Sequence, residues 1–121
     1  MNFVYVALGG AIGAMARYGI SLIPIKTNFP VLTLITNIIG AIIIGFIIGL
    51  LGEKSTSNNT MLFWKTGVCG GFTTFSTFSL EAFNMIENKQ YVGGSVYVLL
   101  SVVCCLLGVF IGKKLSLLFN N

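Results

Sequence analysis

The sequence predicts an all-α integral membrane protein with four transmembrane helices, and three observations carry that prediction. The 121 residues are 55% hydrophobic and only 8% charged, whereas a soluble domain has about 25% charged residues. The mean hydropathy is +0.95. Residues 31–51 and 91–111 are each 21 residues long and carry no charge, and a helix needs about 20 such residues to cross the hydrocarbon core.

The four expected helices are residues 3–23, 31–51, 61–86 and 91–112. The first is apolar except for Arg17 and ends before a loop punctuated by Pro24 and Pro30. We interpret it as a retained helix, because a signal peptide carries basic residues before its apolar run and this segment does not. The second helix has no charged residue and ends near Gly52.

The third helix is the least apolar of the four, since it contains Lys65 and Glu81. The fourth is expected to stop at Gly112, before Lys113 and Lys114. Together the four helices use nearly all of the sequence. We therefore expect residues 1–121 to form a single membrane domain.

Small residues four apart recur in every expected helix, and such pairs let helix backbones approach closely in a bilayer. The pairs are Gly9/Gly13, Gly45/Gly49, Gly67/Gly71 and Gly108/Gly112. Each pair alone is weak evidence, because glycine is frequent in membrane helices. Four pairs in four helices predict a tight bundle.

Basic residues are almost evenly divided between the two ends of this bundle. One end would hold Lys54, Lys65, Lys113 and Lys114, and the other Arg17, Lys26 and Lys89. An excess of basic residues normally fixes which end stays in the cytoplasm. The near balance predicts insertion in both orientations and an antiparallel dual-topology dimer. A single, weakly determined orientation is the alternative.

The ionisable residues argue against catalysis and against nucleic-acid binding. Asp and His are absent from the sequence, although general acid–base catalysis usually recruits those residue types. The net charge of +4 comes from basic residues scattered over short loops, which form no patch for nucleic acid. Cys69, Cys104 and Cys105 fall inside expected spans, where small polarizable side chains fill helix contacts.

Residues 67–81, GVCGGFTTFSTFSLE, do not suit a lipid-facing helix. Glycine costs about 1 kcal/mol relative to alanine within a helix, and β-branched threonine is also unfavourable. The Gly-Gly-Phe-Thr-Thr run therefore predicts a break in the third helix near the middle of the bilayer. Freed carbonyls at such a break are hard ligands suited to a cation such as Na⁺. A simple kink closed by threonine hydroxyls is the alternative.

Phe75, Phe78 and Glu81 follow the break at intervals of three and share one helix face. The edge of an aromatic ring is electropositive, so rings turned edge-on to a pore can receive an anion without a fixed positive charge. Ser76 and Thr77 lie between the rings and add O–H donors. Ordinary packing of the two rings is the alternative.

Two more polar faces are predicted in the other helices. Thr33 and Asn37 lie four apart in the second helix, and Tyr97 and Ser101 lie four apart in the fourth. In a bundle these faces can converge with the third helix on a path lined by hydroxyls and amides. Ordinary interhelical hydrogen bonds, each contributing about 0.6 kcal/mol, are the alternative.

Three stretches of the sequence resemble the Fluc/CrcB family of fluoride channels. They are GGAIGAMARY at 9–18, TNIIGAIIIG at 36–45 and, above all, GVCGGFTTFSTFSLE at 67–81. The resemblance covers all four helices in length and order, although in the fourth it is one of spacing only. It implies a small four-helix protein that pairs as an antiparallel homodimer with two fluoride pores and a structural Na⁺ at its centre.

The resemblance also implies roles for single residues. Backbone carbonyls of Gly70 and Thr73 would hold the central Na⁺. Arg17 would lie near the vestibule, and Glu81 would be the acid of the third helix. Phe75 and Phe78 would line the fluoride path with their ring edges. Asn37 would donate to the anion, and Tyr97, Thr33, Ser101, Ser76 and Thr77 would extend the polar track.

We therefore expect a fluoride-specific channel of the cell membrane, bacterial by the resemblance, that exports cytoplasmic fluoride passively and lowers its toxicity. Two alternatives remain open. One is a small dual-topology, proton-coupled multidrug exporter, although such exporters carry an acid in the first helix and none is present here. The other is a non-conducting partner subunit of a heterodimeric channel formed with a paralogue.

Overall fold

The computed structural model describes residues 2–25, 27–52 and 58–119, and all its regular structure is helical in those ranges. In chain order the helices are α1 (Asn2–Ser21), α2 (Val31–Leu51), α3 (Asn58–Met61), the π-helix η1 (Leu62–Cys69), α4 (Gly70–Phe72), α5 (Phe75–Glu87) and α6 (Tyr91–Ser116). Within these ranges α1, α2 and α6 are long and apolar enough to cross a membrane. The all-helical architecture expected from the sequence is confirmed for these residues, and three of the four expected spans form single helices of membrane-spanning length and composition.

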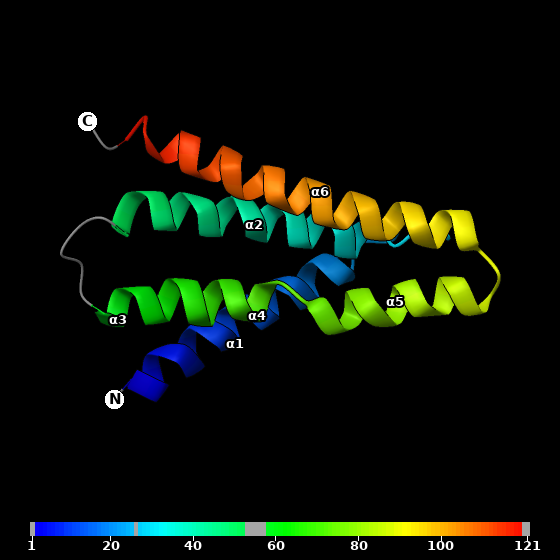
Figure 1. Cartoon of the computed structure of the whole chain (residues 1–121). Helices are drawn as coiled ribbons and strands as arrows, with labels where there is room; N and C mark the ends of the chain where they lie inside the picture. The colour runs from blue at the N-terminus through cyan, green and yellow to red at the C-terminus, as the bar shows by residue number, and fades with distance from the viewer. Residues whose placement is uncertain (1, 26, 53–57, 120–121) are drawn as a thin grey trace.

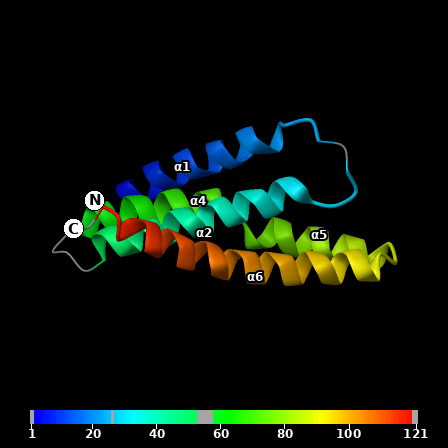
Figure 2. The same ribbon diagram turned by 90° about the horizontal axis from the view of Figure 1, so that it is seen from above.

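The third expected helix is divided into α3, η1, α4 and α5, and this span follows one side of the bundle in Figure 1. α2 and α6 lie side by side and run in the same direction, and their packing is the most extensive in the molecule. α1 packs against η1 and α4, on the side away from α6 (Figure 2). The N- and C-termini lie at one end, and the α5–α6 turn lies at the other.

Glycines permit the close approaches within the bundle. A Cβ atom at Gly13 of α1 would overlap the carbonyl oxygen of Val68 in η1. A Cβ atom at Gly112 of α6 would likewise overlap the carbonyl oxygen of Ile42 in α2. Backbone-to-backbone contact of this kind holds membrane helices together by van der Waals packing, because lipid provides no hydrophobic drive for association.

Two expected boundaries are wrong by a few residues. α6 continues past Gly112 to Ser116, because Gly112 serves a close contact with α2 and does not cap the helix. Ser116 is fully buried, and its hydroxyl donates to the carbonyl of Lys113. α1 ends at Ser21 rather than at residue 23, and its chain leaves through short-range turn bonds such as that from the Leu22 N–H to the Gly19 carbonyl.

Of the basic residues in the described chain, Lys89, Lys113 and Lys114 lie near the ends of the bundle, whereas Lys65 lies within η1 and Arg17 within α1. Lys113 and Lys114 are exposed in the last turn of α6, at the end that carries both termini. Lys89 lies in the α5–α6 turn at the opposite end and has a φ of 64°. Lys26 and Lys54, which the sequence also assigns to the two ends, are outside the described residues.

Candidate functional site

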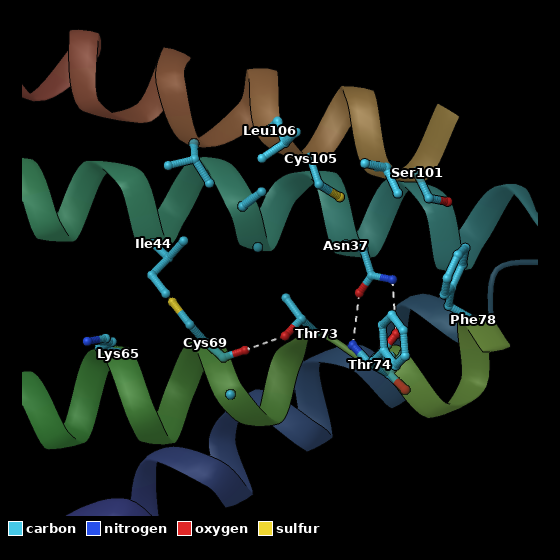
Figure 3. A pocket seen from close by; sticks show the side chains of 16 residues that line it. Asn37, Ile44, Lys65, Cys69, Thr73, Thr74, Phe78, Ser101, Cys105 and Leu106 are labelled. Atoms are coloured by element: carbon cyan, nitrogen blue, oxygen red, sulfur yellow. Dashed lines mark hydrogen bonds between the residues drawn. The ribbon is translucent and has the colours of Figure 1, made fainter. Parts of the chain in front are cut away.

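A groove of about 490 Å³ runs between α2, α6 and the segmented third span. Its walls are mostly apolar, with Ile44 of α2 and Leu106 of α6 among them, and Asn37, Thr73, Thr74 and Ser101 supply polar groups. Figure 3 shows these side chains turned toward the space between the helices. Its shape suits a ligand whose orientation is fixed by a few polar groups in an otherwise apolar cleft.

The chain leaves helical geometry at Thr73 and Thr74, at the middle of this groove. Thr73 has φ −83° and ψ 161°, and Thr74 has φ −148° and ψ 119°, so both are extended. Gly70 and Gly71, which the sequence makes the weakest helix formers here, are themselves helical. The interruption therefore falls on the two β-branched residues that follow the glycines.

Asn37 of α2 holds the extended segment with both halves of its amide. Its Nδ2 donates to the Thr74 carbonyl at 3.0 Å, and its Oδ1 accepts the Thr74 N–H at 2.8 Å. Both bonds are drawn in Figure 3. Each backbone group removed from the helical ladder at Thr74 is thus satisfied by one side chain, as a buried polar backbone requires.

Local hydrogen bonds complete the interruption on both sides. The Cys69 carbonyl accepts from the N–H of Thr73 at 3.1 Å and from its hydroxyl at 2.9 Å. The Thr74 hydroxyl accepts the Thr77 N–H at 3.1 Å, which makes Thr74 the N-cap of α5. One piece of helix therefore ends, and the next begins, within two residues.

The two phenylalanines after the interruption lie together on the groove. Their ring centroids are 5.5 Å apart with an interplanar angle of 49°. Phe78 is buried, whereas Phe75 is 78% exposed in the single chain. Phe78 also packs on Tyr97, with centroids 5.1 Å apart, so its ring is fixed by α6 while the Phe75 ring is free of tertiary packing on one side.

The side chain of Glu81 accepts hydrogen bonds from two residues that were expected to line the polar track. Thr33 Oγ1 donates to Glu81 Oε2 at 3.1 Å, and the Tyr97 hydroxyl donates to Glu81 Oε1 at 3.0 Å. Tyr97 is fully buried. Both hydroxyl protons are thus committed to the carboxylate, and Glu81 joins α2, α5 and α6 in one hydrogen-bonded cluster.

The other serine and threonine of the expected track have different surroundings. Ser101 lines the groove, and its buried Oγ has no hydrogen-bond partner in the described chain. Ser76 is exposed, and its Oγ lies 3.4 Å from that of Thr74. Thr77 is half-buried and contributes its N–H to the cap of α5. Of these three residues, Ser101 is therefore the best candidate to bind a ligand through its hydroxyl group.

Arg17 and Gly70 complete the expected set. Arg17 Nε donates to the Gly71 carbonyl at 3.1 Å, so α1 holds the end of α4. Gly70 is exposed on the groove, and Thr73 is half-buried there. The structure thus brings Asn37, Phe75, Phe78, Ser101, Gly70 and Thr73 to one groove, while Thr33 and Glu81 border a separate cavity of about 150 Å³ beneath the α1–α2 connection.

Several groove residues were not expected from the sequence, and three of them are polar or carry a sulfur atom at the interruption or at the end of the groove. Thr74 is one, although a threonine just before Phe-Ser-Thr is a recognisable N-cap pattern. Cys69 is another, since its carbonyl accepts twice from Thr73 and its side chain is buried against the groove. Lys65 also lines the groove, at the end farther from Phe78 (Figure 3), and no sequence signal distinguishes it from a flanking lysine.

Comparison with known proteins identifies the family of this chain. The family model described as "CrcB-like protein, Camphor Resistance (CrcB)" matches residues 4–113. A "Fluoride-specific ion channel FluC" of Ruminiclostridium cellulolyticum is 46% identical, covering 96% of this chain and 92% of its own length. The protein of the same name from Methanococcus maripaludis is 45% identical over 98% of both chains. One from Coxiella burnetii is 40% identical, covering 95% of this chain and its own full length. The chain belongs to the CrcB family.

Proposed function

We propose that this chain is the subunit of a fluoride-specific channel that lets fluoride leave the cytoplasm passively. The observation that carries the proposal is its similarity, over nearly the full length, to relatives that are named fluoride-specific ion channels. A negative membrane potential favours anion exit by about 2.3 kcal/mol per charge per 100 mV. Passive export therefore needs no energy-coupling residue.

The groove supplies the chemistry that a fluoride path requires. Fluoride must exchange its hydration for donors that are already in place, the general principle of selectivity filters. Ser101 has a hydroxyl without a partner, and Asn37 Nδ2 has a second N–H besides the one given to Thr74. The electropositive ring edges of Phe75 and Phe78 would line the path beside them.

In this proposal the cluster around Glu81 supports the path. Thr33 and Tyr97 both donate to the carboxylate, so they extend the polar track only when an anion competes with Glu81 for their protons. Ser76 and Thr77 would contribute at the first turn of α5, where helical N–H groups favour an anion. Arg17 would act at the vestibule by fixing the Gly71 carbonyl.

The carbonyl oxygens of Gly70 and Thr73 fit a structural Na⁺. In a continuous helix they would accept from the N–H groups of Thr74 and Thr77, but those donors go to Asn37 Oδ1 and to Thr74 Oγ1. Within the described chain the two carbonyls accept no other tertiary or turn hydrogen bond. Unwound carbonyls are the ligands with which broken membrane helices hold Na⁺, so this ion would fix the interruption.

A second, antiparallel copy of this chain is the partner that the proposal requires. One chain offers only two such carbonyls, and Na⁺ needs more oxygens. The groove is open on one side and exposes Phe75 and Gly70, so a copy related by a twofold axis would cover it and supply the matching pair. Irregular backbone is tolerated at membrane depth only when protein or a lined cavity covers it.

Fluoride efflux from liposomes tests the proposed function. Purified protein should release fluoride under a voltage and should not release chloride at a comparable rate. Phe75→Ile and Phe78→Ile should each lower fluoride efflux at least about tenfold, because the ring edges that offer positive charge are lost. Phe83→Ile is the matched control: this phenylalanine is 58% exposed on the same helix and does not line the groove.

Four outcomes would contradict parts of the proposal. Equal rates of chloride and fluoride efflux would contradict the proposed selectivity for fluoride. Normal fluoride efflux in both phenylalanine variants would contradict the proposed fluoride path. No efflux from this chain alone, with efflux restored by a paralogous chain, would establish a heterodimeric channel. Uptake of an organic cation driven by a proton gradient would instead support a multidrug exporter.

A further inference from the structure

The amide of Asn37 does more in this structure than present a donor to the groove. A helical Thr74 would give its N–H to the Gly70 carbonyl four residues earlier. That N–H instead meets Asn37 Oδ1 at 2.8 Å, the shorter of the two bonds made by this side chain. The side chain thus replaces the ladder bond that would close the helix over Gly70.

The second half of the amide reinforces this arrangement. Asn37 Nδ2 donates to the carbonyl of the same residue, Thr74, at 3.0 Å, so the side chain binds both polar groups of one residue. Gly40, one helical turn along α2, leaves the space that the Thr73 methyl group fills. Asn37 and Gly40 therefore form one face of α2 that receives the extended segment.

We propose that Asn37 is a positioning residue for the sodium site, which keeps the Gly70 carbonyl available by binding the Thr74 N–H. The proposal rests on the proposed function, in which Gly70 and Thr73 ligate Na⁺. It assigns the two halves of the amide different tasks. Oδ1 maintains the cation site, and the N–H of Nδ2 that Thr74 leaves free serves the anion path.

Substitutions can separate the two tasks. Asn37→Asp keeps an oxygen that accepts the Thr74 N–H but loses both amide donors. Asn37→Leu has a similar size and loses acceptor and donors together. Asn84→Leu is the matched control, because Asn84 is exposed on α5 and its backbone carbonyl, not its side chain, bonds to the Asn88 N–H.

The experiment measures the Na⁺ concentration that gives half of the thermal stabilisation of the purified protein, together with fluoride efflux. Asn37→Leu should require at least about tenfold more Na⁺ than wild type, the equivalent of one lost hydrogen bond. Asn37→Asp, which keeps the acceptor for the Thr74 N–H but loses the bond to the Thr74 carbonyl, should require less Na⁺ than Asn37→Leu and should still lose fluoride efflux. Asn84→Leu should match wild type in both measurements.

An unchanged Na⁺ requirement in Asn37→Leu would overturn the positioning role while leaving the fluoride channel intact. Absence of fluoride efflux from wild type, with the Na⁺ pattern as expected, would overturn the channel function alone. A wild-type protein that is not stabilised by Na⁺ would overturn the sodium site and this inference together. Asn37→Ser, too short to span either bond, replaces the leucine variant if that variant does not fold, with the same expected rise.

Discussion

Single side chains bind the backbone groups around the point where the third span leaves helical geometry, at Thr73 and Thr74. Asn37 binds Thr74, Arg17 binds the Gly71 carbonyl, and the Thr74 hydroxyl caps α5. Each comes from a different place in the sequence, yet all act within a few residues of the interruption. A polar backbone group left unpaired in lipid costs several kcal/mol, which explains why so many polar side chains gather there.

The hydroxyl of Tyr97 provides a prediction at this scale. Tyr97→Phe removes the donor to Glu81 and keeps the ring that packs on Phe78 and Phe29. The free energy of unfolding in detergent should fall by about 1.5 kcal/mol, the value of a hydrogen bond to a charged acceptor. Tyr91→Phe, at an exposed position of the same helix, should leave it unchanged. Equal stability of all three proteins would mean that Glu81 finds another donor.

Helix pairs in this bundle are held by backbone contact as much as by side chains. α1 meets η1 and α4 through Gly9 and Gly13, and α2 meets α6 through Gly45 and Gly112. Because a Cβ atom at these glycines would overlap the neighbouring backbone, the glycines allow the helices to approach this closely. The position of α1 in turn places Arg17 against the end of α4.

A test of this packing compares two glycines of α1. Gly13→Ala should destabilise the protein by about 1–3 kcal/mol, because the new methyl group overlaps the Val68 carbonyl and backbone strain of that size follows overpacking. A Cβ at Gly19 meets nothing within 4 Å, so Gly19→Ala should be neutral or stabilising by up to about 1 kcal/mol. Thermal unfolding in the same detergent measures both. Equal effects would show that α1 adjusts freely against η1.

For the molecule as a whole, basic residues stand at both ends of the bundle within the part of the chain that the structure describes. Lys113 and Lys114 stand at the end with both termini, and Lys89 stands in the turn at the other end. Orientation in the membrane follows the difference in basic residues between the two sides. We expect a small difference to make the orientation sensitive to single substitutions, and the antiparallel dimer proposed above requires both orientations.

Labelling from outside the cell should reveal this balance. With the native cysteines replaced by alanine, Asn88→Cys in the exposed α5–α6 turn should react with an impermeant maleimide in about half of the molecules. Replacing Lys113 and Lys114 by glutamine should lower the labelled fraction, because the turn then carries more of the charge and stays inside. Lys89→Gln should raise it. A labelled fraction close to zero or close to one, unchanged by all three substitutions, would indicate a fixed orientation.

The sequence by itself determined that this is a helical membrane protein, and it indicated which helices carry polar faces. Length, hydropathy and charge decide those features locally, since a bilayer admits few structures other than apolar helices of a set length. The run from Gly70 to Thr74 also marked a weak helix, because glycine and threonine have low helix propensity wherever they stand.

Only the tertiary structure decided what those polar groups do. Thr33 and Tyr97, expected to line the polar track, donate to Glu81, and the interruption falls on Thr73 and Thr74 rather than on the glycines. Both outcomes depend on partners far away in the sequence. A hydroxyl or a freed N–H binds the acceptor that the packing brings within reach, and no local pattern specifies which acceptor that will be.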